Sequence, residues 1–508
     1  MNVINILCDT LRRDHCGAYH RGRPLDECWS PQQPHWVVPT PNMDRLAARG
    51  TTFTQAWCGS TPCMPARHDI YTGQFEFLSR GWGPLEEDDL DLPRQVSGEP
   101  NRSLSQVAAT GDRISYMISD HFHLWEQGAG NYHMGYSGFD FVRGYEADGL
   151  YTDPIQFFCP PLERDAKLER HFRNVHILGK RDEDSFVAQV FTRAVDWLER
   201  NREHKDFYLH LDCFSPHEPF DPPEELLKLF WPSGYDVDFD WRSAELYEPW
   251  EGRMSEERMN FARARYAAKV VQTDRWLGEL LDAMDRLNLW ENTLVIFTSD
   301  HGTFNGDHGR LGKLQTHEHD AVGHIPLVIC HPTLAQGEQR DQLVQLVDLF
   351  PTTLAAVGKP LPQPPGGLHG VDLLPVLADA SAPTRDYAIC GQFGKSTTLT
   401  DGRWILHQSP ADSSPAGNQP LYWHSHCLSR FLPYKLGPFV DGRRAVIDEP
   451  SWPAPTWLSD KQTDPNELTN LADQQPDQLR TMQRALAQML RDLGAPAEQA
   501  QRLGLGDL

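Results

Sequence analysis

Short apolar segments that end in polar residues alternate with amphipathic helical patterns along much of this chain. The apolar segment VINILC at residues 3–8 is followed by an aspartate, and the helical pattern at 185–201 leads into the apolar segment FYLHLDCF at 207–214. The same order returns with a helical pattern at 265–287 and an apolar segment at 293–299. Apolar runs of this length are typical of strands buried on both faces of a sheet. The alternation therefore predicts an α/β protein whose sheet is covered by helices on both faces.

The alternation ends in a segment rich in proline and alanine at residues 370–386. The sequence beyond it favours short antiparallel strands, and residues 475–494 have the spacing of an amphipathic helix that packs on its own domain. A chain of 508 residues is also longer than one simple core usually requires. We therefore predict a large α/β domain at 1–375 and a smaller C-terminal α+β subdomain at 376–508.

Composition narrows the classes of partner. The formal net charge is −24 without a basic run, and such a field repels nucleic acid and anionic membranes, so neither is an expected partner. No segment reaches the ~20 consecutive apolar residues of a membrane span, and the N-terminus lacks the pattern of a signal peptide. The ten cysteines include no Cys-x-x-Cys pair, which suits reduced thiols better than a zinc module or a disulfide scaffold. The chain is therefore expected to be cytoplasmic.

Candidate chemistry lies directly after the predicted strands. Asp9, His217, Asp300 and His301 all follow apolar segments. Because ligands gather at the carboxyl ends of the strands in α/β sheets, these four side chains are compatible with one shared crevice. Carboxylates and an imidazole in such a place suit a divalent cation such as Ca²⁺, Mg²⁺ or Mn²⁺. Taken singly, each residue is ordinary, since an aspartate after a strand often only caps the next helix.

The stretch CMPARHDIYTG at residues 63–73 is open to two interpretations. On its own, Cys63 beside a proline is ordinarily a small buried residue in a turn, and Arg67 is ordinarily a solvated charge. Lys313 is equally ordinary as a solvated lysine. The alternative is an active site, and it depends on partners elsewhere in the chain.

Together with several other segments, this stretch resembles the type I sulfatases of the alkaline phosphatase superfamily. Their pattern Cys-x-Pro-x-Arg, followed by Thr-Gly, is matched by Cys63, Pro65, Arg67, Thr72 and Gly73. Further segments are similar to sulfatase segments in the same order: DTLRRDHCGAY, TPNMDRLAARGTTFTQAW, SPHEPF, FTSDHG, VDLFPTTLAAVG and DPNELTNLA. The resemblance covers most of the chain and implies a large mixed, mostly parallel sheet of the alkaline phosphatase type.

The resemblance implies a nucleophile that is made after synthesis. In this family the motif cysteine is oxidised to formylglycine by a formylglycine-generating enzyme, so Cys63 would carry the aldehyde. The hydrate of that aldehyde would attack sulfur and displace the alcohol, which splits one difficult displacement into two easier steps. Arg67 and Lys313 would stabilise the charge on the sulfate oxygens.

The remaining roles that the resemblance implies are assigned by position. The metal ligands would be Asp9, Cys63, Asp300 and His301. His121 stands where the family has a lysine that binds substrate, and His123 would assist breakdown of the covalent intermediate. His217 would protonate the leaving alcohol or bind sulfate, and Lys313 would also contact the substrate.

Three departures from the family pattern leave the metal and the substrate open. Asp9-Thr10 stands where Asp-Asp is common, Asp300-His301 stands where Asp-Asn is common, and His121 replaces the usual lysine. The first two also occur in the related phosphonate monoester hydrolases, which share the cysteine motif and are often Mn²⁺-dependent. A nitrogen ligand with fewer carboxylates moves the preference of a site from Ca²⁺ towards Mn²⁺. The segment at residues 121–146, in contrast, is more similar to bacterial sulfatases.

The expected activity is hydrolysis of a small-molecule or carbohydrate sulfate ester, with phosphonate monoester or phosphodiester hydrolysis as the alternative. Transferases of the same superfamily use a threonine nucleophile and usually carry membrane spans, and a binding protein without catalysis would not need Arg67, Lys313 and the histidines together. Aromatic loops at 131–139 and 421–431 are candidates for a sugar or aryl pocket, or are ordinary surface loops. A homo-oligomer is compatible with the sequence.

Overall fold

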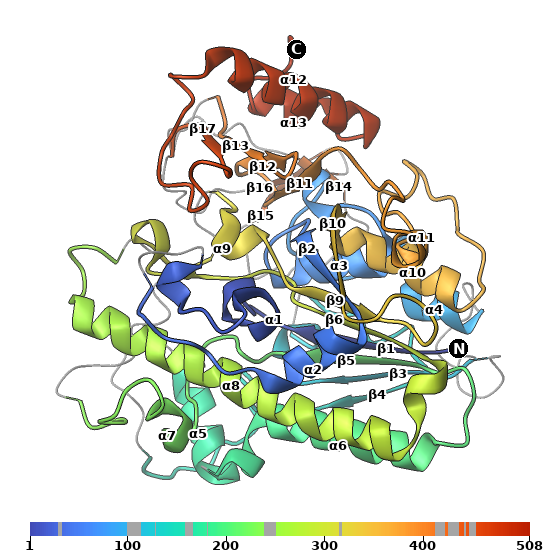
Figure 1. Ribbon diagram of the computed structural model, residues 1–508, viewed down its shortest axis with the longest axis vertical. Helices are drawn as coiled ribbons and strands as arrows, with labels where there is room; N and C mark the ends of the chain where they lie inside the picture. Colours follow the sequence, from blue (N-terminus) through green and yellow to red (C-terminus); the bar gives the residue numbers. More distant parts are fainter. Residues whose placement is uncertain are drawn as a thin grey trace.

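An eight-stranded sheet forms the centre of the structure, a computed structural model (Figure 1). The residues that it describes are 1–28, 33–98, 113–126, 129–157, 166–179, 181–237, 250–313, 317–411, 422–424, 436–440, 443–446 and 454–508. The strand order is β10-β2-β9-β6-β1-β5-β3-β4. The strands are β1 (Asn2–Cys8), β2 (Thr51–Trp57), β3 (Ser115–Ser119), β4 (Gly138–Phe141), β5 (Tyr208–Cys213), β6 (Thr293–Thr298), β9 (Leu327–Cys330) and β10 (Glu338–Gln345).

Seven of these strands are parallel to one another, and β9 runs in the opposite direction. The direct pairs β1–β5, β1–β6, β3–β5, β3–β4 and β2–β10 are parallel. β9 pairs antiparallel with both β2 and β6, so it joins the two parallel parts of the sheet. The predicted large mixed, mostly parallel sheet is therefore confirmed.

Strand β1 lies at the centre of the sheet and is buried on both faces. Ile4 and Ile6 pack into one hydrophobic core, while Val3 and Leu7 pack into the other. All four side chains are fully buried, which explains why VINILC is apolar without a strict alternation.

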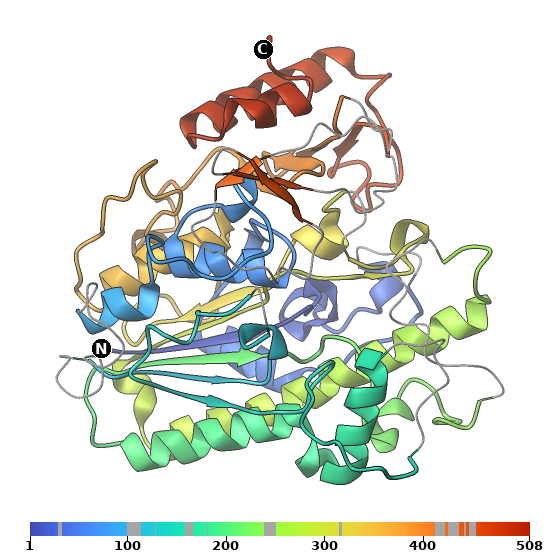
Figure 2. The ribbon, with the colours of Figure 1, turned by 180° about the vertical axis from the view of Figure 1, so that it is seen from behind.

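Helices cover both faces, as Figures 1 and 2 show from opposite sides. One core contains residues of the sheet together with residues of α1 (Gly17–His20), α2 (Pro41–Arg49), α5 (Ala166–Leu178), α6 (Phe186–Asn201), α7 (Glu224–Leu227) and α8 (Glu256–Arg286). The other core contains residues of α3 (Cys63–Thr72), α4 (Leu92–Ser97), α10 (Leu349–Ala356) and α11 (Leu374–Ala378). Two short elements, the hairpin β7 (Phe304–Asn305) and β8 (Leu311–Gly312) and the helix α9 (Asp320–Gly323), follow β6.

Helix α8 begins nine residues before the predicted helical pattern at 265–287. Ser255 caps it by accepting a hydrogen bond from the backbone N–H of Arg258. Its first turn, Glu-Glu-Arg, is polar, so hydrophobic periodicity does not reveal this start. Met259 and Phe261 are nevertheless buried in the core, and their packing stabilises the added turns.

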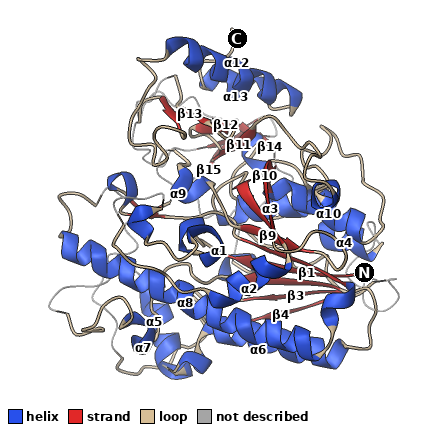
Figure 3. Cartoon of the chain, viewed as in Figure 1, coloured by secondary structure: helices blue, strands red, loops and turns tan. Residues whose placement is uncertain are grey.

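A smaller antiparallel sheet follows in the C-terminal part (Figure 3). Its strands are β11 (Ala388–Gly391), β12 (Thr397–Thr400), β13 (Trp404–Gln408) and β17 (Trp457–Asp460), and a three-stranded sheet contains β14 (Tyr422–His424), β15 (Leu436–Val440) and β16 (Arg443–Val446). Helix α12 (Pro476–Asp492) packs Met482 and Leu486 against the four-stranded sheet, and α13 (Ala497–Arg502) follows. The predicted antiparallel strands and terminal helix are therefore present.

The two parts of the chain are joined through hydrogen bonds and a shared core. Gln345 Nε2 donates to the carbonyls of Cys58 and Ile389 at 2.6 Å each, and Thr61 N donates to the Gly391 carbonyl at 3.0 Å. Helix α11 crosses the predicted boundary at 375/376 and packs in the core of the large sheet. The exact boundary stays a prediction.

Among the described residues, no helix combines the length and the apolar character that crossing a bilayer requires.

Candidate active site

The carboxyl ends of the central strands bring distant acids together at one edge of the sheet. Asp9 follows β1, Asp300 follows β6 after one serine, and Asp212 is the penultimate residue of β5. Because β5 and β6 are the parallel neighbours of β1, these three carboxylates lie side by side. All three are buried.

Helix α3 carries the cysteine motif to the same place, since Cys63 is its first residue. Pro65 lies in the first turn, where a missing backbone N–H costs nothing. Gly73 ends the helix with a φ of +68°, and an added Cβ would lie 3.1 Å from a ring carbon of Phe350. Every residue of α3 is buried, so the motif is part of the interior and not a surface turn.

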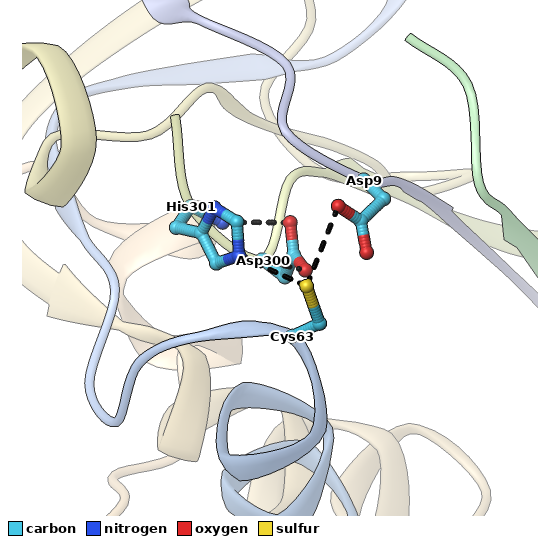
Figure 4. Close-up of side chains that lie close together, drawn as sticks. All are labelled: Asp9, Cys63, Asp300 and His301. Atoms are coloured by element: carbon cyan, nitrogen blue, oxygen red, sulfur yellow. Dashed lines mark hydrogen bonds and ion pairs between the residues drawn. The ribbon is translucent and has the colours of Figure 1, made fainter. Parts of the chain in front are cut away.

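The four residues predicted to hold a metal converge (Figure 4). One ligand atom from each of Asp9, Cys63, Asp300 and His301 lies within 4.8 Å of all the others. Cys63 Sγ is 3.4 Å from His301 Nε2 and 3.8 Å from Asp9 Oδ1. His301 Nδ1 donates to the Gly302 carbonyl at 2.8 Å, so the lone pair of Nε2 faces Cys63 and Asp300.

This set of donors fits a divalent cation. Burial and the charge of Asp300 raise the pKa of Asp9 well above its usual value. A cation between the two carboxylates would remove that repulsion. Burial lowers the pKa of His301 to about 4, so its imidazole is neutral and able to coordinate. Two carboxylates, one imidazole and residue 63 suit Mn²⁺ or a similar transition ion better than Ca²⁺, which prefers oxygen ligands only.

Arg67 holds the carboxylates in place. Its guanidinium pairs with both oxygens of Asp212 at 2.6 and 2.8 Å, with Asp300 at 2.9 Å and with Asp9 at 3.0 Å. A further hydrogen bond joins Arg67 to the Cys63 carbonyl at 3.0 Å. Because the side chain is fully buried among these acceptors, it fixes the geometry of the site rather than pointing into solvent.

Thr10 and Lys313 form a second group beside Asp9. Lys313 Nζ donates to Thr10 Oγ1 at 2.8 Å, and Thr10 Oγ1 donates to Asp9 Oδ1 at 2.7 Å. The hydroxyl of Thr10 thus connects Lys313 to Asp9. An acid at position 10 would instead pair with Lys313 directly. Lys313 is buried and follows the hairpin strand β8.

The three predicted histidines surround the ring of Phe214. His121, His123 and His217 have ring centroids 4.2, 5.9 and 4.0 Å from it. His121 Nε2 is 3.8 Å from Asp9 Oδ2. Both ring nitrogens of the buried His121 lack a hydrogen-bond partner among the described residues, which leaves them available to a substrate oxygen.

His123 and His217 have opposite protonation preferences. His123 Nδ1 contacts Glu126 at 2.6 Å and Nε2 contacts Glu146 at 3.4 Å. Burial alone would lower the pKa of His123, but the hydrogen bonds with these carboxylates raise it. Burial and the charge of Lys313 lower the pKa of His217 well below its usual value, and its Nδ1 donates to the Glu218 carbonyl at 2.6 Å.

The structure adds residues that the sequence patterns do not reveal. Asp212 orients Arg67, and Glu126 and Glu146 flank His123. Glu218 lies 3.8 Å from Lys313. Of these residues, only Asp212 could have been found from the sequence. It is an acid within the apolar segment FYLHLDCF, and such a buried acid requires a partner.

The aromatic loop at 131–139 is mainly a packing element. Tyr132 and Tyr136 are buried, and both pack their rings against Tyr71 of α3. This arrangement favours the structural interpretation of these two tyrosines over the pocket interpretation. The second loop, at 421–431, lies outside the side chains that the structure describes.

Comparisons with known proteins agree with this geometry. The pattern of the family described as Sulfatase matches residues 1–359, so the chain belongs to the sulfatase family. Arylsulfatase K of Rattus norvegicus is 25% identical over 470 residues, covering 87% of this chain and 72% of the relative. The multifunctional alkaline phosphatase superfamily protein PehA of Trinickia caryophylli is 26% identical over 520 residues, covering 93% and 91%.

Solved structures share the fold. The phosphonate monoester hydrolase of Agrobacterium radiobacter superposes with a TM-score of 0.62 at 20% identity, covering 97% of this chain and 95% of that one. A protein in complex with its substrate D-glucosamine-2-N,6-O-disulfate gives a TM-score of 0.63 at 16% identity, covering 97% and 98%. Family membership and the arylsulfatase relatives make this chain a sulfuric ester hydrolase.

Proposed function

We propose that this chain hydrolyses a sulfate ester with a formylglycine formed from Cys63 and a divalent transition cation held by Asp9, residue 63, Asp300 and His301. The observation that carries the proposal is the convergence of these four ligand atoms within 4.8 Å of one another in a buried site. When bound, the cation would lower the charge on the sulfate oxygens, and the hydrated aldehyde would supply a nucleophilic oxygen that a thiol does not offer.

The chain's own residues position the sulfate group. Lys313 and the unpartnered nitrogens of His121 face the region next to Cys63 and Asp9. The ammonium group of Lys313 and the single N–H of a neutral His121 ring donate to the sulfate oxygens on which negative charge develops during the reaction. Arg67 pairs with Asp9 and Asp300 and holds both carboxylates in orientation.

The proton transfers divide between two histidines. His123, protonated between Glu126 and Glu146, donates the proton to the leaving alcohol. His217, neutral with Nδ1 bonded to a carbonyl, accepts a proton on Nε2 when the second step releases sulfate. This division reverses the roles that the resemblance implies for the two residues.

Substitution of Cys63 tests the proposal. Cys63→Ala should abolish hydrolysis of 4-nitrophenyl sulfate while the circular dichroism spectrum and the unfolding temperature stay close to wild type. Cys58→Ala is a matched control, because Cys58 is another buried thiol a few residues before the motif. Mass spectrometry of the active wild-type protein should find an aldehyde in the peptide that contains residue 63. Activity retained in Cys63→Ala, or full activity in protein whose Cys63 is entirely thiol, would refute the proposal.

A second activity on phosphonate monoesters or phosphodiesters is supported by one observation. The hydroxyl of Thr10 stands between Lys313 and Asp9, and His301 supplies a nitrogen ligand, so the site carries less negative charge than one with additional acids. Fewer acids mean less repulsion of an anionic ester, and phosphonate monoesters and phosphodiesters carry the same single negative charge as a sulfate monoester, so they can occupy the same position. We propose sulfate ester hydrolysis as the main activity, on a small-molecule or carbohydrate ester, and maturation by a formylglycine-generating enzyme.

A further inference from the structure

A second group of buried metal-binding side chains lies away from the catalytic residues. It consists of His319 before helix α9, His407 on strand β13 and Glu467 in the segment after strand β17. One ligand atom of each lies within 4.8 Å of the others. We propose that His319, His407 and Glu467 bind a Zn²⁺ ion that joins the C-terminal sheet to the large domain.

The contacts converge on one oxygen atom. His319 Nδ1 and His407 Nε2 each lie 2.8 Å from Glu467 Oε2. The other oxygen, Oε1, accepts the backbone N–H of Asp320 at 3.0 Å and is 3.5 Å from Lys461 Nζ. Oε2 is therefore the oxygen available to an ion, and the carboxylate would bind through that single atom.

The dimensions of the cluster are close to those of a zinc site. Zinc lies about 2.0–2.1 Å from imidazole nitrogens and carboxylate oxygens, which places tetrahedral ligand atoms about 3.3 Å apart. The present nitrogen-to-oxygen contacts are 2.8 Å, so outward shifts of about half an ångström admit the ion. Two histidines and one glutamate are a known zinc ligand set, with water in the fourth position.

The surroundings hold the ligands in a fixed orientation. His407 Nδ1 lies 2.7 Å from Thr398 Oγ1, and this hydroxyl oxygen can accept a hydrogen bond from Nδ1–H when Nε2 is bound to a metal. The rings of His308 and His317 stack on His319 and His407, at centroid distances of 3.9 and 4.9 Å. Two fixed imidazoles lose little conformational freedom when they bind an ion.

The backbone of Glu467 adds an independent indication. Its φ is +55°, in the left-handed region that residues with a Cβ rarely adopt. The carboxylate is fully buried despite this conformation. Unfavourable backbone conformations that persist at buried polar residues often mark a binding site.

The site would link two parts of the chain that are far apart in sequence. His319 belongs to the segment between Lys313 of the catalytic site and helix α9, and the other two ligands belong to the C-terminal part. In Figures 1 and 2, α9 lies beside the C-terminal strands. A bound ion would thus hold His319 and the start of α9 against the small sheet.

Zinc content can be measured separately from the catalytic cation. The background is Cys63→Ala/His301→Ala, which removes the sulfur and nitrogen donors of the catalytic site. We expect this protein, after dialysis against Zn²⁺ and then metal-free buffer, to retain one Zn²⁺ per chain by elemental analysis. Adding Glu467→Gln or His407→Gln should lower the retained zinc to roughly a tenth or less. His331→Gln is the control, since His331 lies beyond strand β9 and is not part of the cluster, and it should leave the zinc content unchanged.

Two further readouts keep the test informative if a variant folds poorly. Co²⁺ added to the folded Cys63→Ala/His301→Ala protein should give the intense visible absorption of a low-coordinate site, and Zn²⁺ should abolish it by competition. Zn²⁺ should also raise the unfolding temperature of that protein. Absence of retained zinc and of the cobalt spectrum in the folded background protein would overturn the proposal. His319, His407 and Glu467 would then be joined by hydrogen bonds alone. Zinc content that is unaffected by Glu467→Gln and His407→Gln would overturn it as well.

Discussion

At the scale of single residues, His301 is the proposed ligand that we expect to set which cation the site prefers. Its Nε2 faces Cys63 Sγ at 3.4 Å, and its Nδ1 is fixed by the Gly302 carbonyl. An asparagine at this position would offer an oxygen to the ion in place of a nitrogen. Oxygen donors favour Ca²⁺, and an imidazole favours the later transition ions.

Replacing this ligand should change the metal preference. In His301→Asn, the ratio of activity with Mn²⁺ to activity with Ca²⁺ should fall by about 10-fold or more, because the nitrogen ligand is gone. The measurement is 4-nitrophenyl sulfate hydrolysis by metal-free protein reloaded with each ion. His331→Asn, on the surface beyond β9, is the control. An unchanged ratio would mean that His301 does not bind the ion.

The pair of carboxylates around His123 should set the pH range in which this residue acts as the proposed proton donor. Hydrogen bonds with Glu126 and Glu146 raise the pKa of His123 against the opposing effect of burial. The donor is active when protonated, so kcat should fall as the pH rises through this pKa. Glu126→Gln removes one of the two charges and should move the alkaline limb of the pH profile to lower pH.

The pH profile distinguishes this role from a structural one. Glu203→Gln, on an exposed loop, should leave the profile unchanged. An alkaline limb that stays in place in Glu126→Gln, or a limb that moves to higher pH, would contradict the assignment of His123 as the donor.

At the scale of elements, helix α3 is tied to three strands by one side chain. Arg67 binds Asp212 of β5 together with Asp9 and Asp300, which follow β1 and β6. All four groups are buried. In the metal-free protein, Arg67 is the positive charge that pairs with all three of these buried carboxylates.

Arg67→Gln should therefore destabilise the fold as well as lower the activity. Breaking a buried ion pair from one side typically costs about 3–5 kcal/mol, and we expect a loss of this size in the free energy of unfolding. Urea denaturation of the metal-free protein gives the value. Arg67→Lys should lose less, since it keeps the charge but not the paired geometry. Stability equal to wild type in Arg67→Gln would show that Arg67 only contacts substrate.

The sequence predicts the candidate metal ligands of this site better than it predicts the residues that contact the other site side chains. Asp9, Asp300 and His301 are found because each follows an apolar strand, and parallel strands bring their ends together. Glu126 and Glu146 are not predicted, because they lie in irregular segments. Hydrophobic periodicity is absent there, so the sequence does not indicate which side chain each carboxylate contacts. The polar start of α8 is not predicted either, because its first turn lacks hydrophobic periodicity. The burial of Met259 and Phe261 stabilises this start.

At the scale of the whole molecule, the two parts of the chain share one core. Phe75 and Phe77, which follow α3, pack with Leu406 of β13 and with Met482 and Leu486 of α12. Gln345 also connects the edge of the large sheet to β11. The small sheet therefore supports the segment that directly follows the cysteine motif.

This shared core predicts cooperative unfolding. Calorimetry of the full chain should show one thermal transition, and a chain ending at residue 385 should fail to give soluble folded protein, because it would expose Phe75 and Phe77 to water. Two separate transitions, or a stable folded fragment 1–385, would show that the parts are independent.

The central claim is that this buried site acts on sulfate esters through residue 63 and a bound cation. The most direct test is the ratio of kcat/KM for an aryl sulfate to kcat/KM for an aryl phosphonate monoester, measured on aldehyde-bearing protein loaded with Mn²⁺. The account predicts a ratio clearly above unity that scales with the aldehyde content at residue 63. A ratio below unity, with the phosphonate monoester as the better substrate, would contradict it.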